Sequence, residues 1–458
     1  MAITTVNPAT GQELQTYALQ SAGEVQAVVD RSRAAFSRWR DVACGERAQL
    51  LKPLAERLRL GADRHARLMV TEMGKPLTEA LAEVEKCAWL CDFYAERAPG
   101  WLADRTVQAD GLEHRVIFQP LGIVLSIMPW NYPYWQALRF AVPPLTAGNT
   151  SILKHASNVT GCGLALAELF AEARFPEHVF QSLVADYQGV QSVLERPEVR
   201  GVSLTGSTRV GVQVAQMAAT GLKKVVLELG GSDPFVVLED ADLDQAVQGA
   251  VTGRMLCTGQ SCIAAKRFIV ARPLAAEFAE RMATAMAALK VGDPLDEGTR
   301  VGAIANSAEL ARLAEFVADA VKLGARLLTG GSRIDRPGSF FAPTVLADVS
   351  PQMRVFREEV FGPIAPVVAF DNEAEAVALA NATQFGLGGS VWTRDLERGE
   401  VVARRLECGT AFVNSIVKSD PRMPFGGVKM SGLGRELGRY GLMEFVNIKG
   451  LNIYSADS

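Results

Sequence analysis

Two cysteines, Cys257 and Cys262, lie close together in the stretch MLCTGQSCIAAKR at residues 255–267. Such a pair can hold a metal, form a disulfide, pack in a core or supply a nucleophile. A zinc site needs further paired ligands, and the chain has neither a CxxC nor a paired His–Cys spacing. Its seven cysteines are irregularly spaced, which is typical of a protein from the reducing cytoplasm. We therefore expect no metal and no disulfide, and weigh core packing against nucleophilic catalysis.

Cys262 has neighbours that favour exposure of its thiol. The small polar run TGQS precedes it, and an expected strand that starts near Ala265 would fix its position. Packing is the usual fate of a free cysteine, and it is our interpretation for Cys44, Cys87, Cys91, Cys162 and Cys408. From this stretch alone, packing and catalysis both stay open for Cys262.

Two polar residues at expected strand ends could complete a catalytic set. Glu228 closes an apolar run before Gly230 and Gly231, at the sheet edge where α/β proteins place their crevice. Burial would raise its pKa toward that of a general base, although a salt bridge at a domain boundary explains the residue equally well. Asn131 follows the run GIVLSIM, where its amide can donate to an oxyanion or simply favour a turn. A cysteine, a glutamate and an asparagine in such places form the set that covalent carbonyl chemistry needs.

A phosphate-binding turn is predicted in LTGSTRVGVQVA, since no GxGxxG follows any expected strand. Gly206 and Ser207 lie there between a strand and a helix, so backbone N–H groups at the helix N-terminus can face a pyrophosphate. The stretch is not a Walker A loop, because Val212 stands where that loop requires lysine.

The elements that position these residues alternate between strand and helix in two series, one over 122–231 and one after it. This order is typical of two α/β domains with parallel sheets. The helix after Asn131 is expected to be interrupted at Pro143 and Pro144. Earlier helices are expected over 21–39, opened by a capping box at Ser21, over 45–70 and over 76–97.

Two β segments have no partner in these series. One is a hairpin at 101–119 that turns at Asp110 and Gly111, and the other is the strand EFVNIKGLNIY at 444–454. They either pair with each other within one chain or dock one subunit on another.

Size and charge limit the function classes. A chain of 458 residues suggests two or three domains. A net charge of -4 provides no electrostatic footprint for nucleic acid or an anionic membrane. No apolar run approaches the roughly 18 residues of a membrane span, and the start MAITTVNPATG lacks the features of a signal peptide.

Taken together, the motifs resemble the aldehyde dehydrogenase superfamily along nearly the whole chain. The matching stretches are VNPATG at 6–11, PWNYP, LTGSTRVG, LELGGSDPF, GQSC, EEVFGPI and PFGGVKMSGLGRE. LKHASN and AWLCDFYAE are similar to stretches of the short bacterial succinate-semialdehyde dehydrogenases. The resemblance implies an α/β fold of two doubly wound domains with a small β oligomerisation flap, in a homodimer or homotetramer. The implied parts are a dinucleotide-binding domain over 1–100 and 120–230, a catalytic domain over 231–435 and the flap over 101–119 and 436–458.

The resemblance also implies a covalent mechanism. Cys262 would be the nucleophile, and its backbone N–H with the Asn131 amide would form the oxyanion hole. A thiohemiacetal would lose hydride to the cofactor, and Glu228 would activate water to hydrolyse the thioester. Cys257 is expected to form a wall of the substrate tunnel. The hydrolytic base argues against a coenzyme-A-acylating dehydrogenase, and the cofactor residues argue against a thiol hydrolase.

The cofactors implied are NAD and NADP. The implied cofactor-binding residues are Trp130, Lys154, Ser157, Gly206, Ser207, Glu359 and Phe361. Ser157 stands where many NAD-specific relatives carry a glutamate that repels a 2′-phosphate, so we expect both cofactors to work, with a lean to NAD. His155 would narrow this pocket or, if protonated, attract the phosphate.

The substrate prediction depends on Arg139, about two helical turns after Asn131. In the semialdehyde dehydrogenases an arginine at this position binds a distal carboxylate, which predicts succinic semialdehyde or a similar substrate. An ion pair between helices is the alternative role for Arg139. The family's second carboxylate-binding arginine is absent, since Leu256 stands there, and Ser415 or Ser419 would supply further hydrogen bonds. The alternative function is a broad-specificity aliphatic or aromatic aldehyde dehydrogenase.

Overall fold

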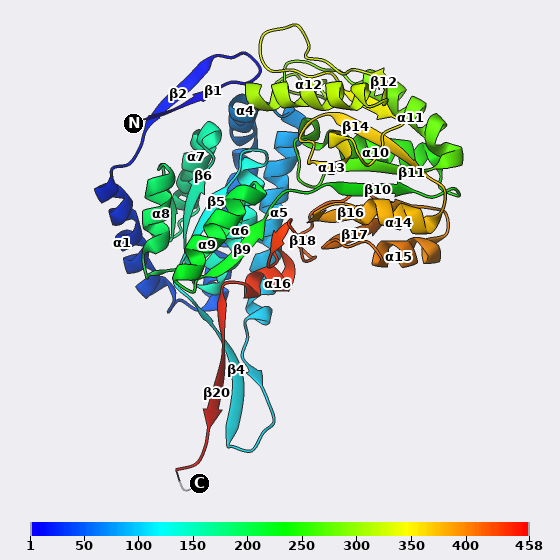
Figure 1. The fold of residues 1–458 in the computed structure, drawn as a ribbon. Helices are drawn as coiled ribbons and strands as arrows, with labels where there is room; N and C mark the ends of the chain where they lie inside the picture. Colours follow the sequence, from blue (N-terminus) through cyan, green and yellow to red (C-terminus); the bar gives the residue numbers. More distant parts are fainter. Residues whose placement is uncertain (1, 457–458) are drawn as a thin grey trace.

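The computed structural model describes residues 2–456 as two α/β lobes with a β flap that projects away from them (Figure 1). The first lobe contains a six-stranded sheet in the order β19-β9-β8-β5-β6-β7, which is parallel except at the edge strand β19. These strands are β5 (Ile123–Met128), β6 (Thr150–His155), β7 (Phe180–Ser182), β8 (Val199–Thr205), β9 (Lys224–Glu228) and β19 (Gly432–Leu433). The predicted α/β fold class is confirmed.

The N-terminal helices differ from the prediction in one place. Helix α1 (Ala22–Trp39) begins with the predicted capping box at Ser21. The single helix expected over 45–70 is three helices, α2 (Cys44–Gln49), α3 (Leu51–Leu60) and α4 (Ala62–Met73). Apolar spacing continues across the bend at Gly61, a poor helix former, so the pattern does not reveal the change of direction. The other helices of the lobe are α5 (Leu77–Trp101), α6 (Pro133–Ala147), α7 (Thr160–Glu172), α8 (Tyr187–Glu195) and α9 (Thr208–Thr220).

Helix α6 runs to Ala147 without the interruption predicted at Pro143 and Pro144. A proline removes one backbone hydrogen bond and crowds the preceding turn. Here both prolines lie in the last turns of a helix whose residues are buried along its whole length. Tertiary packing therefore outweighs the lost hydrogen bonds, and the interruption was a wrong prediction.

The second lobe contains a seven-stranded sheet in the order β12-β13-β14-β11-β10-β16-β17, parallel except at β12. Its strands are β10 (Asp233–Val237), β11 (Ala265–Ala271), β12 (Arg326–Thr329), β13 (Thr344–Ala347), β14 (Ile364–Phe370), β16 (Gly388–Trp392) and β17 (Thr410–Val413). Its helices are α10 (Leu243–Met255), α11 (Arg272–Ala287), α12 (Ser307–Lys322), α13 (Arg354–Arg357), α14 (Glu373–Asn381) and α15 (Leu396–Arg404). The second predicted strand–helix series therefore forms this lobe.

The flap is a three-stranded antiparallel sheet of β3 (Arg105–Thr106), β4 (Glu113–Pro120) and β20 (Val446–Ile453). The two β segments without partners therefore pair with each other within one chain, along all 8 residues of β20. Helix α16 (Gly438–Met443), which the sequence placed in the flap, packs on α5 and α6 instead. Tyr94 Oη donates to the Gly438 carbonyl at 2.8 Å in this contact.

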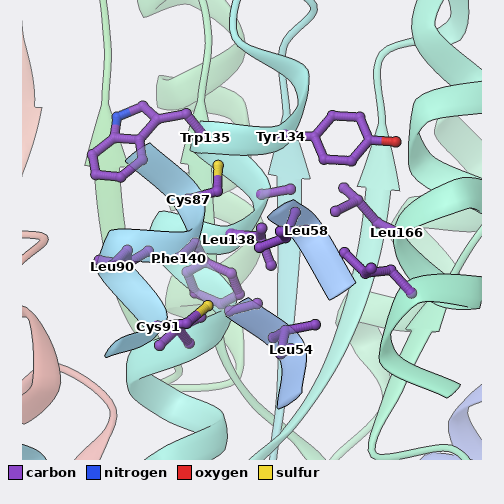
Figure 2. Packing of buried hydrophobic residues seen from close by; sticks show 14 of the residues in the cluster. Leu54, Leu58, Cys87, Leu90, Cys91, Tyr134, Trp135, Leu138, Phe140 and Leu166 are labelled. Carbon is purple, nitrogen blue, oxygen red and sulfur yellow. The ribbon is translucent and has the colours of Figure 1, made fainter. Parts of the chain in front are cut away.

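The core of the first lobe packs α5 and α6 against the helices around them (Figure 2). Leu54 and Leu58 of α3 contact this cluster, and the thiols of Cys87 and Cys91 lie inside it. Burial agrees with the predicted packing role of these two cysteines and of Cys162. Within residues 2–456, no helix combines the length and apolar character that a membrane span requires.

Candidate active site

The chain between α10 and β11 forms a strained loop that presents Cys262. Cys257 and Thr258 have φ values of 54° and 58°, and Gly259 follows with 78°. For residues other than glycine, this left-handed conformation costs on the order of 1 kcal/mol or more each. Surrounding contacts must therefore hold the loop in place.

Contacts from both lobes supply that support. Glu79 of α5, in the first lobe, accepts the backbone N–H of Cys257 through Oε2 at 2.7 Å. Gly302, in the second lobe, donates its N–H to Thr258 Oγ1 at 2.9 Å. The Gln260 side chain also bonds to main chain of the second lobe, at 2.9 Å and 3.1 Å. Contacts from both lobes thus hold the loop.

Cys257 does not form a wall of a substrate tunnel, so that expectation was wrong. Its side chain is 0% exposed, and its Sγ donates to the Asn131 carbonyl at 3.3 Å. Burial raises the pKa of this thiol to about 12. The left-handed turn directs Cys257 into the interior, and the neighbouring Leu256 takes the lining position.

Cys262 lies where two cavities meet. A small cavity of about 210 Å³ and a large cavity of about 500 Å³ both include it in their lining, together with Gln136 of α6. Lys266 Nζ donates to the carbonyls of Ser261 and Cys262 at 2.9 Å and 2.6 Å, just inside the strand β11 that starts at the predicted residue. The thiol is therefore both positioned and accessible from two sides.

The thiol of Cys262 is protonated at neutral pH in this state. Burial raises its pKa to about 12, against the opposing effect of the Lys266 and Arg139 charges. Only a thiolate is a good nucleophile. Attack on a carbonyl therefore requires a base to take the proton, or further positive charge beside the sulfur.

Asn131 lies beside Cys262 in the turn between β5 and α6. It is 3% exposed and lines the large cavity. Its Nδ2 donates to the Gln260 carbonyl at 3.0 Å, which fixes the amide. An amide nitrogen has two hydrogens, so one is left for an oxygen that develops charge at Cys262.

Glu228 ends β9 as predicted but lines neither cavity. It is 2% exposed, and neither of its carboxyl oxygens has a hydrogen-bond partner within residues 2–456. Burial, together with the nearby Glu436 carboxylate, raises the pKa of Glu228 well above its usual value. Glu436 forms an ion pair with Arg139. The structure thus places Glu228 beside the buried Arg139–Glu436 pair. To act as a base at Cys262, the Glu228 side chain must turn toward that residue.

The large cavity has a helix N-terminus and an aromatic pair. Gly206 and Ser207 line it, and Ser207 is the N-cap residue of α9, so the first N–H groups of that helix face the cavity. Trp130 and Phe361 line it as well, with ring centroids 5.8 Å apart in a T-shaped arrangement. The helix terminus suits an anion, and the rings suit a flat heterocycle.

Glu359 adds a fixed carboxylate to the large cavity. It accepts the N–H of Gly231 at 3.0 Å and lies 3.7 Å from Lys266 Nζ. A Cβ at Gly230 would come within 2.5 Å of Glu359 Oε2, so glycine leaves room for this carboxylate. A carboxylate held in this way can accept hydrogen bonds from ribose hydroxyls. The donors and acceptors of this cavity therefore fit a dinucleotide.

The remaining predicted cofactor residues lie at the end of β6. Lys154 lines a small hollow beside β7, and Ser157 is exposed in the turn that follows. His155 is buried, and its Nε2 donates to the Pro133 carbonyl at 2.8 Å. Burial lowers the pKa of His155 to about 4, so it is neutral at physiological pH. His155 lines the hollow, and a neutral imidazole favours the role of narrowing this pocket over attraction of a phosphate.

The small cavity is largely apolar, but Arg139 and Ser419 reach it. The Arg139 guanidinium lies 4.7 Å from the ring centroid of Phe425. Its Nε faces Glu436, while its buried Nη2 has no hydrogen-bond partner within the described residues. Arg139 does form an ion pair, but Glu436 lies in the segment before α16 and not on a helix, and the Nη2 group is left over. Ser415 does not line this cavity.

The sequence analysis missed several residues of the site, among them Glu79, Lys86, Gln136, Lys266 and Glu436. Glu79 and Lys86 belong to α5, and charged residues in a helical pattern are normally interpreted as facing solvent. Lys266 had a usable signal, since it follows Cys262 closely in IAAKR. The others gave none, because the contacts join segments that are far apart in the chain.

Comparisons with known proteins agree with this geometry. Residues 1–451 match the aldehyde dehydrogenase family. The chain is similar to succinate-semialdehyde dehydrogenase (NADP(+)) 1 of Mycobacterium tuberculosis, with 46% identity over 98% of this chain and 99% of that protein. It is also similar to succinate semialdehyde dehydrogenase (NAD(P)+) Sad of Escherichia coli, with 44% identity over 97% of this chain and 96% of the relative. The solved structure of succinic semialdehyde dehydrogenase from Streptococcus pyogenes in complex with NADP+ superposes with a TM-score of 0.96 and 35% identity, and the match covers 99% of this chain and 100% of that chain.

Proposed function

Because the chain belongs to the aldehyde dehydrogenase family, we propose that it oxidises succinic semialdehyde, or a similar short aldehyde with a distal carboxylate, to the acid with NAD(P)+. The observation that carries this proposal is the position of Cys262. It lies between a small cavity that contains Arg139 and a large cavity that fits a dinucleotide. The names of the relatives support the same substrate.

In the proposed reaction, the Cys262 thiol releases its proton to water in the cavities, with the Lys266 and Arg139 charges favouring the thiolate. The sulfur then attacks the aldehyde carbon from its place between the cavities. The second Asn131 hydrogen and the Cys262 backbone N–H stabilise the oxyanion of the thiohemiacetal. Trp130, Glu359 and Phe361 would hold a nicotinamide cofactor, which would accept the hydride that the thiohemiacetal loses as it becomes the thioester. Glu228 then turns from its buried position and takes a proton from the water that hydrolyses the Cys262 thioester.

The substrate proposal predicts a strong preference for a charged aldehyde. The native enzyme should use succinic semialdehyde at least about 30-fold better than butyraldehyde in kcat/KM, because a charge-assisted contact in a closed cavity contributes roughly 2 kcal/mol. Steady-state kinetics with both substrates measure the ratio. Equal values would instead identify a broad-specificity aldehyde dehydrogenase.

We further propose that the chain uses both NAD and NADP. Ser157 is exposed and uncharged near Lys154, so no carboxylate repels a 2′-phosphate there. The relatives carry NADP(+) or NAD(P)+ in their names, which gives no support to a lean toward NAD. Ser157→Glu should lower kcat/KM for NADP about 10-fold or more relative to NAD, since two negative charges would meet. Ser157→Gln is the matched control, and undetectable turnover of native enzyme with NADP would contradict the proposal.

The flap supports the proposal of a homodimer or homotetramer. Strand β20 lies at an edge of its sheet, and Ile448 on it is 59% exposed. An apolar edge strand of this kind is suited to pairing with a second chain. Sedimentation at a multiple of 49.2 kDa would support the assembly, and a monomer would exclude it.

The cysteines of the described residues are all free thiols, which supports a reducing compartment such as the cytoplasm.

A further inference from the structure

We infer that Lys86, together with Ser419, binds the distal carboxylate of the aldehyde in the small cavity. This inference rests on the proposed function and names a residue that determines its specificity. Lys86 lies on α5 and lines the small cavity beside Arg139.

The contacts of Lys86 leave most of its donors free. Its Nζ donates to Ser419 Oγ at 2.8 Å and lies 4.2 Å from the ring centroid of Trp135. A lysine ammonium has three hydrogens, and a hydroxyl that accepts from it keeps its own hydrogen to donate. Lys86 and Ser419 thus offer a carboxylate two kinds of hydrogen bond from one place.

The charge of Lys86 is also unneutralised, since it forms no ion pair within residues 2–456. The acids nearest to it have other partners. Glu83 forms an ion pair with Lys75, which is wholly buried, and Asp420 forms one with Arg422 at 2.6 Å.

The second cation of the cavity is partly neutralised. Glu436 faces the Nε of Arg139. The charge of Lys86, which is half-buried in this largely apolar cavity, costs free energy unless an anion binds beside it. The substrate carboxylate is the anion that the proposed reaction brings.

The surroundings of Lys86 make the effect dependent on pH. Burial, aided by the positive charge of Arg139, lowers the pKa of Lys86 to about 8, while Cys87, Glu83 and Asp420 oppose this shift. Below pH 8 the ammonium is present, and above it the charge is lost. The preference for a carboxylate aldehyde should therefore fall as pH rises through about 8.

Two substitutions and two substrates test the inference. Succinic semialdehyde and butyraldehyde both have four carbons and differ in the distal carboxylate, so their ratio of kcat/KM isolates its recognition. Lys86→Met removes the charge and should lower this ratio at least about 10-fold, while Lys86→Arg should keep it within about threefold. In the native enzyme the ratio should fall between pH 7 and pH 9.5, and in Lys86→Arg it should stay flat. Glu79 also lines the small cavity, and burial raises its pKa to about 7, so the pH dependence that belongs to Lys86 is the part that the native enzyme shows and Lys86→Arg does not.

The possible results separate the inference from the proposed function. A native ratio near one overturns the proposed substrate and the inference with it. A high native ratio that Lys86→Met leaves unchanged overturns the inference alone and assigns the carboxylate to Arg139. If Lys86→Met fails to fold, Lys86→Gln, which also lacks the charge, decides by the same ratio: an unchanged ratio overturns the inference.

Discussion

Replacement of Cys262 by serine is expected to lower kcat/KM for aldehyde oxidation at least about 1,000-fold while the protein stays folded. A serine hydroxyl is a poor nucleophile without a strong base beside it. Glu228 lines neither cavity, and a carboxylate is too weak a base to form a serine alkoxide even after its side chain has turned toward the site. Steady-state kinetics and a thermal unfolding curve measure the two parts of the prediction.

Cys257→Ser is the matched control for this experiment. Cys257 is buried away from both cavities, and a serine hydroxyl can keep its hydrogen bond to the Asn131 carbonyl. This variant should retain activity within about 10-fold of the native enzyme, the loss coming from weaker packing. The assignment of the nucleophile is wrong if Cys257→Ser is inactive and Cys262→Ser is active.

Glu228→Gln is expected to release one equivalent of reduced cofactor per chain and then to turn over at least about 100 times more slowly than the native enzyme. Glutamine resembles the protonated carboxyl that burial favours at this position, so the fold should tolerate it. It cannot accept a proton from water, and the thioester on Cys262 should accumulate. Rapid mixing would show a burst followed by a slow steady phase, and mass spectrometry of the quenched enzyme would show the added acyl group.

The outcome of this experiment distinguishes two roles for Glu228. A burst with a slow second phase places the residue in hydrolysis of the thioester. Loss of the burst as well would show that Glu228 mainly takes the proton from the Cys262 thiol. Glu228→Asp is the control, since it keeps a carboxyl of similar acidity on a shorter chain and should restore part of the steady rate.

The parts of this fold that follow from local patterns were predictable. Alternating strands and helices indicated two α/β lobes, and the capping box at Ser21 marked the start of α1. Glu228 was expected at a strand end and is found there, because an apolar run ends at that residue. Helix α6 continues through Pro143 and Pro144 because burial of the whole helix outweighs the lost hydrogen bonds. A proline pair in the sequence does not indicate that burial.

The side-chain contacts of the site were not predictable from the chain alone. The partners of Arg139 and Lys86 are Glu436 and Ser419, which lie about three hundred positions later in the sequence. No local spacing indicates which acid a buried arginine meets, or that a charge on α5 faces inward. The burial of Glu228 beside the Arg139–Glu436 pair was missed for the same reason. The roles of these residues stay predictions until the variants are measured.

The loop at Cys257–Gly259 also has a consequence for how the enzyme assembles. Glu79 from one lobe and Gly302 from the other hold its left-handed backbone. Each lobe folds around its own sheet, as domains generally do, and a chain with both lobes formed but undocked would already have nearly all of its native secondary structure. Its loop would nevertheless lack the Glu79 contact, and Asn131 would not yet lie beside Cys262. Recovery of activity after denaturation is therefore a measure of lobe docking, and it should come later than the recovery of the helical signal.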